Sequence, residues 1–477
     1  MLDRAGRDEA PASNGAAPDR RVRTPSPIGV TLVGIVVVGV LLRVWRLGFN
    51  GLTYDESFTA MAARLSFGHL FDYLRTQDSH PPIDYLLRAP LARAGASDVL
   101  LRAPSFVFSC AALVLFAWWM RTRGLAGIVA TAVLAGSTFQ IYHGGEARMY
   151  AVLELLGVAS AIVAERWLRD DAPVWCAWVA GALVAVALFD HVSGFLLGAG
   201  MVAVAGVRID RQAWQWRAAL AGALLLWVVV WGSSFVDQAG GDWVGWIPRT
   251  TPTSFARAVS GQVTDLEPLA WLVLAGVVVG GWCLWRADRR LASVWLAVGA
   301  VPFVAAAAVG AVSPFLIDRA VTVASWAPPL ALGYAVTTLV MRVPLLGRAT
   351  AVVLVAVVVL GTVTFLSGKR YDSDLAVHHL DAVVQPGDVI ATRPARYATL
   401  PGYRIGVEQW HDTRWVSTPG IDHAAAFRAG DVPATGRIWL FTPDSFELSF
   451  AGYRACGNTT PWTDGVTHVV CLERTSS

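Results

Sequence analysis

Long apolar runs separated by short polar connections fill the sequence from residue 27 to residue 367. A helix needs about 20 predominantly apolar residues to cross the hydrocarbon core of a bilayer. Eleven runs approach or reach that length, at 27–47, 101–120, 124–142, 150–168, 173–190, 192–207, 217–236, 269–285, 291–312, 320–341 and 346–367. The pattern predicts an α-helical polytopic membrane protein with about 11 transmembrane helices. The fifth and sixth runs are the least clearly separated, because only Asp190 and His191 lie between them.

The composition agrees with a membrane protein. Of the 477 residues, 55% are hydrophobic and 15% are charged, and the mean hydropathy is +0.50. Soluble domains usually contain about 25% charged residues. The net charge of +3 says little about partners, because the position of the cations along the chain matters more than their sum.

The placement of arginine predicts the orientation in the membrane. Every second connection is basic, and these connections contain Arg20, Arg21 and Arg23; Arg121 and Arg123; Arg166 and Arg169; Arg208, Arg211 and Arg217; Arg286, Arg289 and Arg290; and Arg342 and Arg348. Basic connections face the cytoplasm. We therefore predict a cytoplasmic N-terminus with a disordered polar tail at 1–25. Arg43 and Arg46, at the other end of the first run, depart from the rule and are expected to snorkel to the interface.

This orientation places the remaining connections on the outer side, at 48–100, 143–149, 190–193, 237–268, 313–319 and after 368. In the first of these, Glu56–Leu70 and Ile83–Ala94 have the amphipathic pattern of helices that lie on a membrane surface. The long loop 237–268 contains Trp243 and Trp246 and could be a lid or binding element, or equally an interfacial anchor.

The composition changes to that of a soluble domain after the last run, which ends a predicted transmembrane domain at 26–368. A helix is predicted at Leu375–Val384, and strands are predicted at Asp388–Thr392, Gly436–Thr442 and His468–Leu472. Residues 369–477 therefore form a small α/β domain outside the cytoplasm. A disulfide between Cys456 and Cys471 requires that location, whereas the other three cysteines lie in apolar runs.

Candidate chemistry begins directly after the first apolar run, where Asp55 and Glu56 are adjacent. A carboxylate at a membrane surface could be a general base or a ligand of a divalent cation. Equally, Asp55 could cap the N-terminus of the helix that follows. A second cluster contains Asp78 and His80, followed by two prolines that fix an extended entry into the next helix. By itself this second cluster favours a structural turn.

Three further polar pairs lie on the same predicted side. Glu146 and Arg148 could pair with each other or bind an anionic group, since neither is cheaply buried alone. Arg319, after Asp318, could bind a phosphate with its planar guanidinium or be a solvated charge at a helix end. The turn at Asp190 and His191 is interpreted as structural. The convergence of these groups on one side is more informative than any single pair.

Several short motifs, in order, resemble the glycosyltransferase-C (GT-C) superfamily over about residues 40–330. They are Arg-Leu-Gly at 46–48, Thr-Tyr-Asp-Glu-Ser at 53–57, His-Pro-Pro-Ile-Asp-Tyr-Leu-Leu at 80–87, Leu-Arg-Ala-Pro-Ser at 101–105, Glu-Ala-Arg-Met-Tyr at 146–150 and Trp-Ile-Pro at 246–248. The most similar branch is that of the bacterial integral-membrane transferases related to protein O-mannosyltransferases and lipid A aminoarabinose transferases.

The resemblance implies an enzyme that transfers a sugar, with inversion, from a polyprenyl-phosphate-linked donor to an envelope glycan, lipid or protein. It implies that Asp55 is the catalytic base with Glu56 beside it. Residues implied to bind substrate are Asp78, His80, Glu146, Arg148, Tyr150 and Arg319. The family often has Tyr after this arginine, and Ala320 stands there instead. Transfer would occur on the outer face of a bacterial cytoplasmic membrane.

No cofactor is required by this interpretation, although the outer-loop carboxylates could hold a divalent cation, and no nucleic-acid partner is expected. A lipid or sugar transporter or flippase is the rival class. It needs polar groups at mid-membrane depth, and Glu154 is the main ionisable residue within the apolar runs. A non-catalytic envelope assembly protein is a third class, for which neutralising Asp55 would have no effect.

Overall fold

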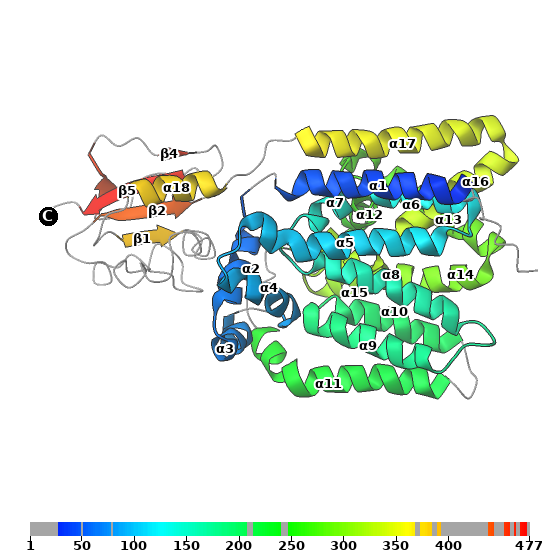
Figure 1. The fold of residues 1–477 in the computed structure, drawn as a ribbon, viewed down its shortest axis with the longest axis horizontal. Helices are drawn as coiled ribbons and strands as arrows, with labels where there is room; N and C mark the ends of the chain where they lie inside the picture. The colour runs from blue at the N-terminus through cyan, green and yellow to red at the C-terminus, as the bar shows by residue number, and fades with distance from the viewer. Residues whose placement is uncertain are drawn as a thin grey trace, which may run out of the picture.

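The computed structural model describes residues 27–48, 51–77, 80–207, 213–239, 247–367, 373–383, 389–392, 437–442, 453–457, 462–463 and 468–474. Most of these residues form a bundle of long helices that run side by side (Figure 1). Trp243 and Trp246, in the predicted lid or anchor loop, lie outside the described residues.

Each predicted apolar run coincides with a helix or with consecutive helical segments. These are α1 Pro27–Leu47, α5 Asp98–Met120, α6 Gly124–Gly136 with α7 Thr138–Gly144, α8 Tyr150–Trp167, α9 Trp175–Asp190, α10 Gly194–Val207, α11 Ala213–Ala239, η2 Glu267–Leu269 with α13 Ala270–Ala287, α14 Arg289–Val294 with η3 Trp295–Ala300 and α15 Val301–Val312, η4 Asp318–Ala324 with α16 Ala327–Arg342, and α17 Pro344–Ser367.

Six of the described helical segments are long and apolar enough to cross a membrane, or up to eight if each of two bent pairs is one span. The bends are 53° between α6 and α7 and 68° between η4 and α16. Helices α9 and α10 are apolar but shorter, and α8 contains Glu154, Glu165 and Arg166. The prediction of a helical multi-pass membrane protein is confirmed, and the total of 11 spans stays a prediction.

The outer surface of the bundle is apolar, as a bilayer requires. Large hydrophobic side chains are exposed along α11, α15 and α17, for example Val229 at 74%, Val312 at 79% and Leu345 at 82%. A hollow of about 690 Å³ between α1, α6 and α17 is lined almost entirely by aliphatic residues. Such a continuous apolar surface is unfavourable in water and is typical of a face covered by lipid.

Arg43 and Glu154 are two of the ionisable side chains that are buried between the helices. Arg43 of α1 is fully buried, and its Nε donates to Ser109 Oγ at 2.8 Å. The same hydroxyl donates to Glu154 Oε2 at 3.3 Å. The prediction that Arg43 snorkels to the interface is therefore wrong. Glycine at position 144 leaves room for the Ser109 side chain, because a Cβ there would lie 2.7 Å from Ser109 Oγ.

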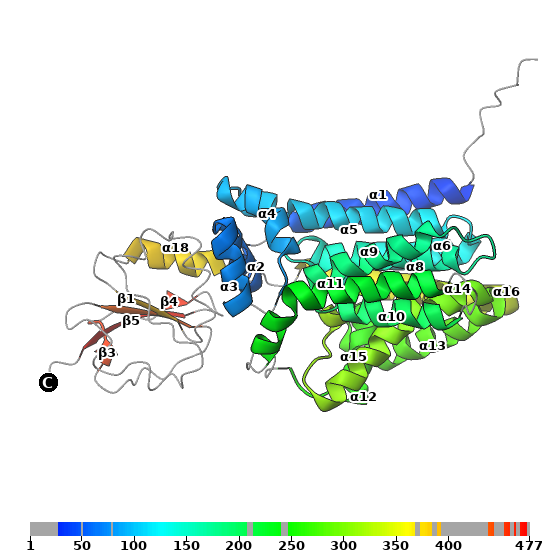
Figure 2. The same ribbon diagram turned by 90° about the horizontal axis from the view of Figure 1, so that it is seen from below.

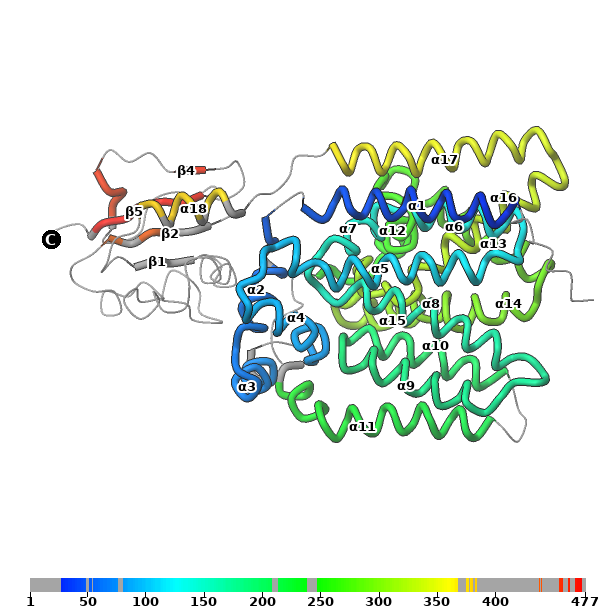
Figure 3. The backbone as a smooth tube through the Cα atoms, viewed as in Figure 1, coloured from blue at the N-terminus to red at the C-terminus, as the bar shows by residue number. Residues whose placement is uncertain are grey.

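Three short helices cover one end of the bundle, and the chain returns from them along α5 (Figure 3). They are α2 Tyr54–Arg64, α3 Phe67–Gln77 and α4 Ile83–Arg93. The predicted helix Glu56–Leu70 is in fact two helices, because Leu65 is extended with ψ 150°. Nor does α4 simply lie on a surface. It buries Asp84 and Arg88, which form an ion pair of 2.8 Å.

The C-terminal residues form the predicted small α/β domain, which lies beyond the α2–α4 end of the bundle (Figures 1 and 2). The domain contains α18 Ser373–Val383, β1 Val389–Thr392, β2 Ile438–Thr442, β3 Tyr453–Ala455, β4 Trp462–Thr463 and β5 His468–Arg474. The strand order is β1-β2-β5-β3, with β4 also paired to β5. Strands β1 and β2 are parallel, and the other pairs are antiparallel.

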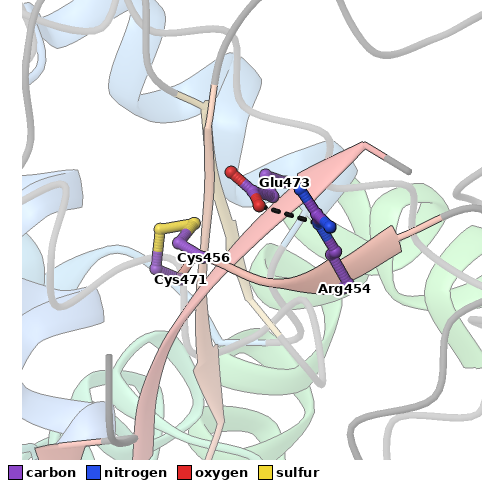
Figure 4. Close-up of a disulfide and its surroundings, with 4 residues drawn as sticks. All are labelled: Arg454, Cys456, Cys471 and Glu473. Carbon is purple, nitrogen blue, oxygen red and sulfur yellow. Dashed lines mark hydrogen bonds and ion pairs between the residues drawn. A yellow bond between two sulfur atoms is a disulfide. The ribbon is translucent and has the colours of Figure 1, made fainter. Parts of the chain in front are cut away.

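A disulfide joins Cys456 to Cys471 next to the β3–β5 pair (Figure 4). On the same pair of strands, Arg454 Nε donates to Glu473 Oε1 at 2.8 Å. The remaining cysteines, Cys110, Cys176 and Cys283, are free and lie in the helices. Because stable disulfides form outside the reducing cytosol, this bond favours an extracytoplasmic location for the domain.

We predict that alkylation of the denatured protein without reductant will modify three cysteines, and all five after reduction. Cys456→Ser should free one additional thiol, because Cys471 loses its partner. Intact-protein mass spectrometry measures the number of labels. Five labels without reductant, on protein quenched directly from cells, would contradict the disulfide and the oxidising location together.

Candidate functional site

A capping box at the start of α2 fixes the position of the adjacent carboxylates. The Glu56 amide donates to Thr53 Oγ1 at 3.3 Å, and the Thr53 amide donates to Glu56 Oε2 at 2.8 Å. This reciprocal pair satisfies two amide groups that a helix N-terminus otherwise leaves without partners. Thr53, and not Asp55, is therefore the capping residue, and Asp55 lies in the first turn of the helix.

The Glu56 carboxylate is buried and bound to two other segments of the chain. Arg102 of α5 donates to it through Nε at 2.6 Å and Nη2 at 2.8 Å. The amide of Ala147 donates to Oε1 at 2.7 Å. Burial would raise the pKa of this carboxyl, but the hydrogen bonds and the charge of Arg102 outweigh it and lower the pKa. Glu56 thus holds α2, α5 and the segment before α8 together.

The side chain of Asp55 points away from Arg102 and pairs with Arg319. Its Oδ2 accepts a hydrogen bond from Arg319 Nη1 at 2.9 Å, and its side chain remains 31% exposed. Arg148 Nη1 donates to Thr59 Oγ1 at 2.9 Å and reaches the Asp55 carbonyl oxygen at 3.4 Å. Burial would raise the pKa of Asp55, but Arg148, Arg319 and His80 together hold it below its usual range. These charges favour the ionised form of the carboxyl.

Hydrogen bonds to the backbone at or next to each arginine fix the positions of Arg148 and Arg319. The Arg148 carbonyl oxygen accepts hydrogen bonds from Ser105 Oγ at 2.9 Å and from Arg88 Nη2 at 3.1 Å. Arg319 lies in η4, where its amide donates to Asp318 Oδ1 at 2.7 Å. Gln262, which follows α12 (Pro252–Gly261), donates to the Asp318 carbonyl oxygen at 3.0 Å. Segments far apart in the sequence thus bring two cations to one carboxylate.

A row of rings continues from this group into the bundle. His80 packs edge-on against His191 with ring centroids 4.9 Å apart. His191 lies 5.9 Å from Tyr150, and Tyr150 lies 4.5 Å from His143. At the end of the row, His143 Nδ1 and Glu146 Oε2 are 2.8 Å apart. Glu146 thus pairs with His143, whereas Arg148 turns toward Asp55 and Thr59.

The structure brings together most of the residues singled out in the sequence. Asp55 contacts Arg319 through its carboxylate and Arg148 through its carbonyl oxygen. His80 and Tyr150 each pack against His191. Glu56 lies behind this group, and Asp78 lies outside the described residues. Arg102 and His191 are among the contributors that were given no role from the sequence. Arg102 stands in the Leu-Arg-Ala-Pro-Ser motif, which was the available signal, and His191 was interpreted as part of a structural turn.

A divalent cation at the outer-loop carboxylates stays a prediction, because Asp78 lies outside the described residues. Among the described residues, no group of three or more His, Cys, Asp or Glu side chains is arranged to hold a metal ion. Arg102 engages both Glu56 oxygens, and Arg319 engages Asp55. In the described residues, each of these two carboxylates is thus paired with an arginine.

No protein-family model matches this sequence, and no curated protein matches it. Solved structures do match its fold. ArnT from Cupriavidus metallidurans, bound to undecaprenyl phosphate, matches with a TM-score of 0.62 and 14% identity over 93% of this chain and 97% of that one.

Two structures from Archaeoglobus fulgidus match more distantly, each with a TM-score of 0.50, 11% identity and 82% of this chain covered. One is an oligosaccharyltransferase in complex with zinc and sulfate, of which this chain covers 62%. The other is the oligosaccharyltransferase AglB with an inhibitory peptide and a dolichol-phosphate, of which it covers 64%. The motif order, the helical bundle and these neighbours agree, and the chain has the fold of the GT-C superfamily.

Proposed function

We propose that this protein is a membrane glycosyltransferase that uses a polyprenyl-phosphate-linked sugar donor. The acceptor is a glycan, lipid or protein of the cell envelope, and the reaction takes place on the outer face of the cytoplasmic membrane. The observation that carries the proposal is the carboxylate of Asp55, held 2.9 Å from Arg319, with Arg148 at the carbonyl oxygen of the same residue, at one end of a GT-C bundle.

The geometry supports a single displacement with inversion at the anomeric carbon. The acceptor hydroxyl gives its proton to the Asp55 carboxylate as its oxygen bonds to the anomeric carbon. The bond from that carbon to the phosphate oxygen breaks, and the polyprenyl phosphate leaves with the electron pair. Arg319 and Arg148 stabilise the charge on the departing phosphate. No step of the reaction is assigned to a metal ion.

The lipid class of the donor is supported by two neighbours of the same fold. ArnT was solved with undecaprenyl phosphate and AglB with a dolichol-phosphate. A lipid phosphate enters from the membrane, so a site at the end of an apolar bundle suits it. The adjacent carboxylates then have separate roles: Asp55 accepts the proton, and Glu56 positions the helix that carries it.

We predict that Asp55→Asn lowers sugar transfer by about 10²- to 10⁴-fold, the usual contribution of a general base. Transfer from radiolabelled polyprenyl-phosphate sugars to membrane acceptors measures the effect at matched expression. The control is Asp72→Asn, which removes an exposed carboxylate on α3. Equal transfer by Asp55→Asn and wild type would remove Asp55 as the base. No transfer by folded wild type with any donor would instead favour a transporter or an assembly protein.

We expect Glu56→Gln to lower the stability of the fold, and not to act directly on the transfer reaction. It leaves the Arg102 guanidinium buried beside a neutral partner, and breaking a buried ion pair costs about 3–5 kcal/mol. Thermal unfolding in detergent should show a clear loss for this variant. Asp55→Asn, whose ion pair is about one-third exposed, should unfold close to wild type. A Glu56→Gln protein that is as stable as wild type but inactive would assign Glu56 to the chemistry.

The pH dependence of transfer tests the pairing of Asp55 with Arg319. Because Arg319 lowers the pKa of Asp55, Arg319→Gln should raise that pKa toward the usual value of about 3.9. The base is then protonated at higher pH, so the acid limb of the pH–rate profile should move upward. Arg454→Gln, which removes an ion-paired arginine of the C-terminal sheet, is the control. An unmoved limb would mean that another group is the base.

A further inference from the structure

The hollow of about 690 Å³ on the lipid-facing surface lies between α1, α6 and α17, and its walls are almost entirely aliphatic. On α1 it extends from Thr31 to Leu42, which is about 17 Å at a rise of about 1.5 Å per residue. The hydrocarbon core of a bilayer is about 30 Å thick, so each leaflet supplies about 15 Å. The hollow is therefore about as deep as the hydrocarbon of one leaflet.

Small side chains keep this space open. Gly34 lines the hollow, and no atom lies within 4 Å of the place that a Cβ would take there. Ala132 and Gly136 line it on α6. Helix α17 is fixed against α6, because Thr362 Oγ1 donates to the Gly136 carbonyl oxygen at 2.7 Å. An empty apolar space loses dispersion contacts, so in a bilayer this hollow takes up hydrocarbon chains.

A cation stands at the α2–α4 end of the hollow. Arg46 lies one turn beyond Leu42 on the same face of α1, because residues four apart in a helix lie above one another. Its guanidinium carbon is 5.1 Å from the ring centroid of Phe365 on α17 and 5.4 Å from that of Tyr142 on α7. The guanidinium of Arg46 is thus placed between three helices, next to the end of the hollow.

The neighbouring Trp45 indicates the level of this end in the membrane. Its side chain is 67% exposed in the last turn of α1, and exposed tryptophans are enriched where a bilayer meets water. Arg46 is half-buried, so part of its surface remains accessible. A guanidinium that stacks on rings keeps N–H groups at its edge, and these bind phosphate oxygens. A lipid with a chain in the hollow would place its phosphate at this level.

The other side of Arg46 is closed. A pocket lined by Arg46 together with Glu56 and Arg102 has a volume of only about 10 Å³, which is the least that holds one water molecule. Glu56 is bound to Arg102 at 2.6 Å. Glu146 also lines this pocket, and its Oε2 lies 2.8 Å from His143 Nδ1. A head group at Arg46 therefore does not pass between these pairs.

This closure separates the hollow from the carboxylate of Asp55. The Asp55 side chain points away from Arg102 and pairs with Arg319. A sugar attached to a phosphate at Arg46 would have to cross the buried Glu56–Arg102 pair to reach it. The lipid that the hollow fits is therefore a resident of the bilayer and not a sugar donor.

We propose that the hollow binds one glycerophospholipid with an anionic head group. Its acyl chain lies between α1, α6 and α17, and its phosphate binds Arg46. The inference does not depend on the proposed function. The bound lipid bridges α1 and α17, and it thereby supports the helix that precedes the C-terminal domain.

The test measures binding of the first lipid to the purified, delipidated full-length protein by native mass spectrometry. The probes are phosphatidylglycerol, which is anionic, and phosphatidylcholine, which is zwitterionic. Arg46→Gln removes the cation, and Arg75→Gln is its matched control, since Arg75 also lies over a ring, 6.0 Å from the Trp231 centroid. Val38→Phe narrows the hollow, and Val229→Phe adds the same bulk to the exposed face of α11.

We expect wild type to prefer phosphatidylglycerol to phosphatidylcholine. Arg46→Gln should weaken binding of phosphatidylglycerol by about five- to tenfold, the usual effect of one basic residue at a membrane surface, and should remove the preference. Val38→Phe should weaken binding of both lipids, and both control variants should bind as wild type does. An excess of undecaprenyl phosphate should leave the phosphatidylglycerol bound. Thermal unfolding shows which variants are folded, and Val38→Phe decides the outcome if Arg46→Gln is not.

Three results would overturn the inference. Wild type could bind the two phospholipids equally, which would remove the role of Arg46 in choosing the head group. Val38→Phe could bind as Val229→Phe does, which would mean that no lipid occupies the hollow. Undecaprenyl phosphate could displace phosphatidylglycerol one for one, which would assign the hollow to the sugar donor. A failure of sugar transfer leaves each of these results unaffected, so the two proposals are tested separately.

Discussion

The carboxylate of Glu56 accepts hydrogen bonds from Thr53, Arg102 and Ala147, and the position of Asp55 depends on it. A buried carboxylate is costly unless its charge is paired and its oxygens are hydrogen-bonded. Here both conditions are met by groups from three separate segments. Successive residues of a helix point about 100° apart, so a neighbour fixed inward turns Asp55 toward the arginines.

The same logic extends to the cations. Arg148 is held through its carbonyl oxygen by Ser105 and Arg88, and Arg319 is held through η4 by Gln262. Their charges are thus in place before an anion arrives, which is the condition under which fixed charges stabilise a leaving group most effectively. In the unliganded site, the negative charge of Asp55 offsets the positive charge of Arg319.

Much of the fold could be predicted from the sequence, because a bilayer imposes long apolar runs and their boundaries coincide with the helices found. The split of Glu56–Leu70 into α2 and α3 could not, since nothing in the apolar pattern marks the extended Leu65. The burial of Arg43 was missed because its partner Ser109 is on another helix. Similarly, nothing in the sequence assigned different roles to the neighbouring carboxylates Asp55 and Glu56. The capping box and the contact with Arg102, both made by Glu56, distinguish them.

His191 shows why site residues are harder to predict than spans. In the sequence it is one of two polar residues in a tight turn, and turns of this kind are commonly structural. Its environment comes from Ser193 in the same turn and from three other places in the chain, which contribute His80, Arg148, and Arg319 with Ala320. A neutral imidazole carries one N–H and one lone pair, so the sequence alone could not show which of its nitrogens donates.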